Sequence, residues 1–198
     1  MDSAPDKGGF FDLKPQFVSH VFYHSNLGNR IIHLLCIWPL VCTGLLLLHY
    51  LPLPWISHIN LTSPVNLDVA LVCTMLYMLT FLAMEPIAGT LGSIMVFCIN
   101  IWTFWLVQSS NLVLGYHLWQ AVLCLHLVLL LVLFISHKVF EGTSQPLMDS
   151  WDPITVKVPL FILLEVLFSI GYRSRFYENC LEEVKNYQYG NRHVKHCD

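Results

Sequence analysis

Histidine is the residue type in this sequence with the greatest capacity for chemistry. Ten histidines occur in a chain of 198 residues, of which only 12% are charged. Imidazole binds Fe, Zn, Cu and Ni, and an added carboxylate shifts the preference toward Fe or Mn. An ionisable side chain near a membrane segment is a functional candidate, because it is costly to leave unpaired in lipid. The positions of the histidines relative to the apolar segments therefore decide which of them can form a site.

Three of these histidines lie at the ends of apolar segments. His24 and His33 are nine residues apart, about two and a half helical turns, so one straight helix would point them in opposite directions. The intervening residues 26–29, Asn-Leu-Gly-Asn, predict a break that can aim both rings at one point. His137 closes a later apolar segment, and Glu141 follows it by one helical turn.

The elements that position these residues are predicted to be membrane helices. With 56% hydrophobic residues and a mean hydropathy of +0.60, much of the surface requires lipid cover. Crossing a bilayer takes about 20 helical residues. Four segments are long enough, or nearly so: Ile31–Leu51, Leu67–Met84, Ile87–Val107 and Leu118–Ser136. A fifth apolar segment, Ile154–Ile170, is interrupted by Lys157, Pro159 and Glu165. We expect an all-α, polytopic helical membrane protein.

The basic residues predict the topology. No Lys or Arg occurs between Ile31 and His137, and basic flanks tend to stay cytoplasmic. With four crossings, the basic residues that precede the first span and those that follow the fourth lie on the same side of the membrane. Five full crossings, the alternative, would carry the basic tail across the membrane. We therefore expect four transmembrane helices, an interfacial or re-entrant fifth helix and a cytoplasmic N-terminus. Residues 1–172 would form one membrane-embedded domain, and residues 173–198 a polar cytoplasmic tail.

This topology gathers several candidate ligands at one face. They are His24, His33, Glu85, His137 and Glu141. Such convergence is what a metal site between packed helices requires, and histidines with a carboxylate and open positions favour non-haem Fe(II). His126 shares the helical stripe of His137 but lies deeper, so ligation, cavity lining or a supporting hydrogen bond all remain open.

Other interpretations compete with the metal site. We expect His49, His58 and His117 to be packing residues, and the tail residues His193 and His196 to be solvated. Seven scattered cysteines without a CxxC pair indicate reduced thiols. A formal net charge of −3 and the lack of a basic stripe argue against a nucleic-acid partner. A transporter or channel has little support, because the segments carry few charges and no repeat.

Short motifs surround the three histidines. In the N-terminal part they are Phe11-Asp12-Leu13, Tyr23-His24-Ser25-Asn26, Ile32-His33 and Trp38-Pro39. Further on they are His137-Lys138-Val139-Phe140-Glu141, Pro146-Leu147-Met148-Asp149 and the apolar segment from Pro159 to Tyr172. Together they resemble the signature of the small membrane proteins typified by the yeast 2-hydroxy fatty acid dioxygenase. The resemblance runs from about Phe10 to Tyr172.

The resemblance implies a chemistry for the site. It implies an Fe(II)-dependent enzyme of the endoplasmic reticulum membrane that shortens long-chain 2-hydroxy fatty acids by one carbon, using O2, in phytosphingosine breakdown. His24, His33 and His137 would then bind Fe2+, and the fourth ligand would be Glu141, Glu85, another histidine or water. Membrane lipid would surround the protein, and the sequence indicates no particular protein partner.

The chain departs from this family's pattern near His137. Ser136 and Lys138 stand where the family often has glycine, and Leu133 stands where it usually has glutamine. His20 occupies a position where the family commonly has tyrosine. These departures predict that a polar group supporting the ligands is missing. They leave open an alternative function, that of a non-catalytic lipid-binding or scaffolding membrane protein that retains the fold.

Overall fold

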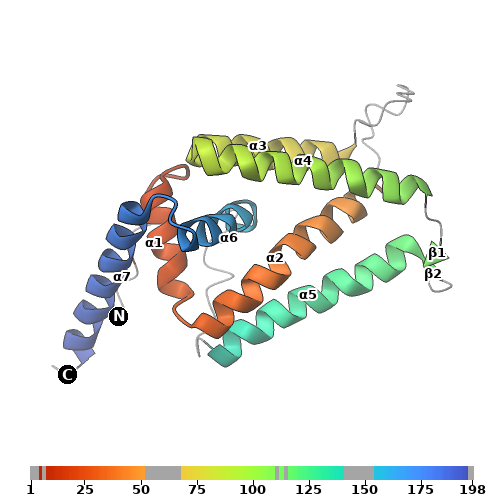
Figure 1. The fold of residues 1–198 in the computed structure, drawn as a ribbon. Helices are drawn as coiled ribbons and strands as arrows, with labels where there is room; N and C mark the ends of the chain where they lie inside the picture. The colour runs from red at the N-terminus through yellow and green to blue at the C-terminus, as the bar shows by residue number, and fades with distance from the viewer. Residues whose placement is uncertain are drawn as a thin grey trace.

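The computed structural model of the chain describes residues 5, 8–51, 68–109, 112–113, 116–140 and 154–195. The described part is helical apart from one short hairpin (Figure 1), which confirms the expected all-α fold. The elements are α1 (Leu13–Tyr23), α2 (Leu27–Leu48), α3 (Val69–Met84), α4 (Pro86–Ser109), β1 (Leu112–Val113), β2 (Tyr116–His117), α5 (Leu118–Phe140), α6 (Ile154–Ser169) and α7 (Ser174–Lys195).

In the part of the chain that the structure describes, three helices are long and apolar enough to cross a membrane: α2, α4 and α5. The helix α3 is equally apolar but has only 16 residues, fewer than the 20 or so that a full crossing takes. All four predicted segments thus coincide with helices. Four crossings, and the position of the fifth apolar segment relative to the membrane, stay predictions.

The predicted break between His24 and His33 is present. The helix α1 ends at Tyr23, and α2 begins at Leu27. The side chain of Asn26 caps α2 by accepting a hydrogen bond from the Gly28 amide at 2.8 Å. A Cβ atom on Gly28 would overlap the ring of Phe140, so glycine here lets α2 approach the end of α5 closely. The break and this close approach bring α1, α2 and α5 to one corner of the molecule (Figure 1).

The helices α3 and α4 form a tight hairpin. A Cβ atom on Gly89 would overlap the carbonyl oxygen of Phe81, so glycine is required where the two backbones meet. Glu85 lies in the connection and is 3% exposed. Its Oε2 accepts from the Ala88 amide at 2.5 Å, and its Oε1 accepts from Tyr172 at 2.9 Å and Arg173 at 3.1 Å. Glu85 therefore ties the hairpin to the segment between α6 and α7.

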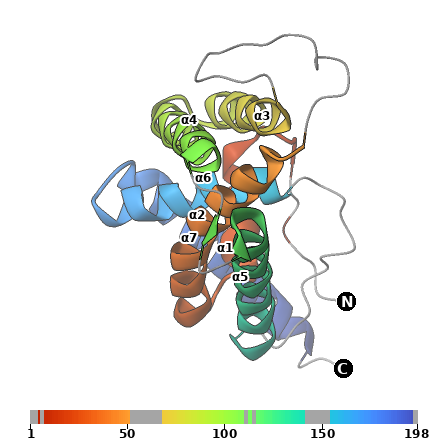
Figure 2. The ribbon, with the colours of Figure 1, turned by 90° about the vertical axis from the view of Figure 1, so that its right-hand side faces the viewer.

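The helix α6 lies at the centre of the bundle and contacts α2, α3 and α4 (Figure 2). Apart from Lys157 and Glu165 it is largely apolar, and Leu160, Ile162 and Leu164 are at most 1% exposed, as expected for a helix enclosed by others. The helix α7 packs against α1 through the buried side chains of Cys180 and Val184. The segment predicted as a polar tail thus contains a helix with an apolar face, and the proposed domain division at residue 172 stays a prediction.

Candidate metal centre

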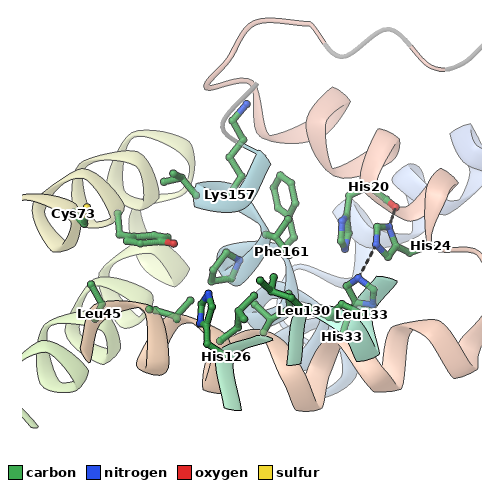
Figure 3. Close-up of a pocket in the computed structure, with 18 of the residues that line it drawn as sticks. His20, His24, His33, Leu45, Cys73, His126, Leu130, Leu133, Lys157 and Phe161 are labelled. Atoms are coloured by element: carbon green, nitrogen blue, oxygen red, sulfur yellow. Dashed lines mark hydrogen bonds between the residues drawn. The ribbon is translucent and has the colours of Figure 1, made fainter. Parts of the chain in front are cut away.

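Three helix ends bring together the histidines singled out from the sequence. His24 caps the C-terminal end of α1, His33 lies in the second turn of α2, and His137 lies in the last turn of α5. Their candidate ligand atoms all lie within 4.8 Å of one another. The Nε2 atom of His33 is 3.3 Å from Nε2 of His24 (Figure 3) and 3.1 Å from Nε2 of His137. Among the residues that the structure describes, no other His, Cys, Asp or Glu joins this group.

Backbone carbonyls fix the tautomers of two of the rings. His24 Nδ1 lies 2.9 Å from the carbonyl oxygen of His20, and His33 Nδ1 lies 2.9 Å from that of Asn29. A carbonyl oxygen can only accept a hydrogen bond, so each neutral ring carries its proton on Nδ1. Each Nε2 atom therefore presents a lone pair to the centre of the cluster.

This donor set fits a metal ion. Two lone pairs that face each other across 3.3 Å repel unless a cation or a proton lies between them. Imidazole binds metal at about 2.1 Å, which places neighbouring donor nitrogens about 3.0–3.4 Å apart for octahedral to tetrahedral angles. The two distances from His33, 3.1 and 3.3 Å, lie within that range, and the ligand atoms of His24 and His137 lie within 4.8 Å of each other. The carbonyl bonds to Nδ1 are the supporting contacts that metal-binding histidines usually make.

Burial keeps His24 in the neutral form. The pKa of His24 lies well below its usual 6.5, first because burial disfavours the imidazolium and second because His20 and His33 add like charge. A neutral ring is the form that can bind a metal at neutral pH. His20 stacks on His24 with 4.3 Å between ring centroids, so it covers the face of this ring.

An ion pair lies beside the cluster. Glu165 on α6 has one carboxylate oxygen 3.6 Å from Nε2 of His20 and the other 3.2 Å from Nε of Arg30. Arg30 also donates to the hydroxyl of Tyr177 on α7 at 3.3 Å. This network links the central helix and α7 to both segments that carry His24 and His33.

The other candidate ligands lie elsewhere. Glu85 bonds to Tyr172, Arg173 and the Ala88 amide and is not part of the histidine cluster. His126 Nδ1 lies 2.8 Å from the hydroxyl of Thr43, in the wall of a cavity rather than at the cluster. Glu141 lies outside the described residues.

The remaining histidines are not part of the cluster or lie outside the residues whose side chains the structure describes. His49 packs as expected, with Nδ1 2.6 Å from Asp68 and Nε2 3.1 Å from the hydroxyl of Thr103, where α2, α3 and α4 meet. His117 lies on β2 and is exposed. His58 and His196 lie outside the described residues, and the side chain of His193 is not described.

A largely apolar cavity of about 770 Å³ extends from the histidines. One stripe of α2 runs along it, comprising His33, Ile37, Leu40, Val41, Gly44, Leu45 and Leu48. The far end is lined by α3 through Cys73, Leu76 and Tyr77, with Phe161 of α6 at the side (Figure 3). The residues of this lining were not predicted from the sequence. The residues of the α2 stripe recur every three or four positions in the sequence, a spacing that could have indicated that they form one continuous wall of a cavity.

The sequence of the chain is similar to that of known proteins. The chain is 25% identical over 167 residues to a Saccharomyces cerevisiae protein named 2-hydroxy-palmitic acid dioxygenase, an alignment that covers 84% of this chain and 86% of the yeast protein. No solved structure matches the chain. The sequence profile of one family matches residues 10–170, which include all three clustered histidines and the cavity wall. The chain therefore belongs to the family described as 2-hydroxy-palmitic acid dioxygenase Mpo1-like.

Proposed function

We propose that this protein is an Fe(II)-dependent dioxygenase that shortens long-chain 2-hydroxy fatty acids by one carbon. The observation that carries the proposal is the meeting of three histidine Nε2 atoms at one end of an apolar cavity. The family match and the name of the yeast relative supply the substrate class. The coarser role, in the metabolism of 2-hydroxy fatty acids, follows from family membership.

His24, His33 and His137 would hold the ferrous ion through Nε2. Three histidine ligands leave positions for the hydroxyl and carboxylate of the substrate and for O2, and the bound ion would supply the electrons that activate O2. The overall reaction is balanced: one 2-hydroxy acid and one O2 give the acid shortened by one carbon, one CO2 and one water. The C1–C2 bond breaks, the hydroxyl-bearing carbon becomes the new carboxyl carbon, and O2 is the oxidant.

The residues of this chain would position the substrate. The acyl chain would lie along the α2 stripe, with its polar head at His24 and His33 and its tail toward Cys73. Ile37 and Val41, both buried, would exclude water from the methylenes next to the head group. The backbone carbonyls of His20 and Asn29 would hold two ligand rings in place through oxidation and product release.

The cellular setting is part of the proposal. We propose an endoplasmic reticulum membrane protein with a cytoplasmic N-terminus, in which residues 1–172 form the catalytic domain and residues 173–198 a cytoplasmic tail. The absence of Lys and Arg between Ile31 and His137 supports this orientation. A role in sphingolipid breakdown would follow if the 2-hydroxy acid derives from phytosphingosine.

The test is a reconstituted reaction. The full-length protein, purified in detergent and supplied with Fe(II), O2 and 2-hydroxypalmitate, should form pentadecanoate and CO2 in equal amounts. Metal analysis should find about one iron per chain, and the His24→Ala, His33→Ala and His137→Ala variants should lose both iron and product. Thr43→Ala provides a control variant, because it removes a polar contact from the same cavity but not a proposed ligand. Iron-free protein without product, or alanine variants with wild-type activity, would contradict the proposal.

A further inference from the structure

Asn29 contacts two of the three clustered histidines. It is 0% exposed, and its backbone carbonyl accepts the hydrogen bond from Nδ1 of His33 at 2.9 Å. Its side-chain Nδ2 lies 3.5 Å from Nδ1 of His137. The hydroxyl of Ser136 lies 2.8 Å from Asn29 Oδ1 and 2.8 Å from the carbonyl oxygen of Leu133. One amide thus connects α2 to the last turn of α5 beside the cluster.

The amide orientation shown favours the His137 tautomer that carries its proton on Nε2. With Nδ2 facing His137, the amide donates to Nδ1 of that ring, so the neutral ring carries its proton on Nε2. This Nε2–H can donate to the lone pair on Nε2 of His33, which is 3.1 Å away. The Ser136 hydroxyl has one hydrogen but faces two acceptors, Asn29 Oδ1 and the Leu133 carbonyl.

The opposite amide orientation suits a cluster with a metal. Turning the amide by 180° exchanges Oδ1 and Nδ2, two atoms of nearly equal size. Oδ1 would then accept from Nδ1–H of His137, which leaves a lone pair on Nε2 as in His24 and His33. Nδ2 would donate to the Ser136 oxygen, whose own hydrogen would go to the Leu133 carbonyl. The Ser136 hydroxyl would then have a single acceptor for its hydrogen, and all three Nε2 atoms would point lone pairs toward a bound metal.

We propose that Asn29 and Ser136 form an amide switch that sets the tautomer of His137 and links it to the binding of a divalent transition metal. Asn29 is a positioning residue, because it acts on the site through His137. The inference rests on the proposed metal site and adds the reason that His137 can serve as a ligand. Leu133 and Ser136, two of the positions at which the chain departs from the family's pattern, supply a carbonyl and a hydroxyl to this switch.

The first part of the test needs no metal. In the full-length metal-free protein labelled with 15N-histidine, nitrogen shifts report which ring nitrogen of His137 carries the proton. We expect the Nε2–H tautomer in the wild type and a shift toward Nδ1–H in Asn29→Asp, because a carboxylate at this position can accept from Nδ1–H but cannot donate to Nδ1. Ser93→Ala, which removes a buried hydroxyl elsewhere in the helical bundle, is the matched control. An unchanged tautomer in Asn29→Asp would overturn the switch, whatever the metal affinity.

The second part measures Co2+ binding by its visible absorbance. Asn29→Leu should weaken Co2+ binding about 10- to 100-fold, and Ser136→Ala should weaken it less. Asn29→Asp should retain most of the affinity, because a carboxylate can still accept from Nδ1–H of His137. Asn29→Asp as weak as Asn29→Leu would overturn the switch. Failure of the wild type to bind Co2+ would overturn the metal site and the switch together. Normal binding by wild type and Asn29→Leu alike would overturn the switch alone.

Discussion

Glu165 on α6 accepts a hydrogen bond from Arg30 on α2, with 3.2 Å between Oε2 and Nε. The side chain of Glu165 is 11% exposed and that of Arg30 is 26% exposed, so water screens this pair only in part. The second oxygen of the same carboxylate faces His20, which stacks on His24. The central helix is therefore joined to the proposed metal site by a charged contact rather than by apolar packing alone.

Replacing this carboxylate should destabilise the protein. Glu165→Gln removes the negative charge and leaves Arg30 without its ionic partner, and hydrogen bonds to charged groups contribute about 1.5–3 kcal/mol. We expect a lower midpoint of thermal unfolding in detergent. Glu183→Gln is the control, because its pair with Lys14 at 2.7 Å is exposed and should have no measurable effect. Equal midpoints for the two variants would show that the Glu165 pair contributes no more than a surface pair.

A larger side chain at Gly44 should shorten the preferred substrate. Gly44 lines the cavity three helical turns from His33. Among the described residues, a Cβ atom there would contact only Cε1 of His126, at 3.6 Å. Gly44→Ala should therefore be tolerated. Gly44→Leu should fill the cavity and reduce turnover of 2-hydroxypalmitate at least tenfold relative to a short 2-hydroxy acid. A kcat/KM series over chain length checks this, and parallel losses at every length would argue against an acyl chain at this position.

Two glycines of α4 should differ in their tolerance of alanine. At Gly92 an added Cβ would come within 2.9 Å of the Phe81 ring, which can shift. At Gly89 the obstacle is the Phe81 carbonyl, which belongs to the backbone and cannot move without separating α3 from α4. Overpacking typically costs about 1–3 kcal/mol. We expect Gly89→Ala to lower the midpoint of thermal unfolding more than Gly92→Ala does. A milder effect at Gly89 would mean that the hairpin is less tightly packed than described.

Acid should destabilise the metal-free protein through His24. Its pKa is lowered in the folded state by burial, whereas in the unfolded chain it returns to about 6.5. Below pH 6.5 the unfolded state therefore binds more protons than the folded state, and stability falls as the pH falls. The slope from this one group is at most about 1.4 kcal/mol per pH unit. Unfolding midpoints from pH 7.5 to 5.5 should decline, and the decline should be smaller in His24→Gln.

Much of the fold could be predicted because apolar length and charge placement are local properties of the sequence. All the predicted apolar segments are helical, and the break at residues 26–29 was indicated by Asn26 and Gly28. The gathering of His24, His33 and His137 required only that three helix ends share one face. Such reasoning assigns residues to a face of the molecule but does not fix distances within it.

The remaining features depend on contacts that leave no periodic signal. Glu85 was expected near the histidines because it lies at a helix end, but Tyr172 and Arg173, 87 and 88 residues away, bind its carboxylate instead. His126 shares a stripe with His137, yet three helical turns separate them by about 16 Å. Sharing a helical face therefore could not make both of them ligands of one ion.

The spacing of the three histidines along the chain has a consequence for biosynthesis. His24 and His33 are made early, whereas His137 follows His33 by 104 residues. Synthesis proceeds at about 5–20 residues per second, so a nascent chain carries only two of the three histidines for roughly 5–20 seconds. Iron met during that interval would be held weakly and released. Loading of the proposed iron site would therefore await the completed, membrane-inserted polypeptide, and metal content would then report correct assembly.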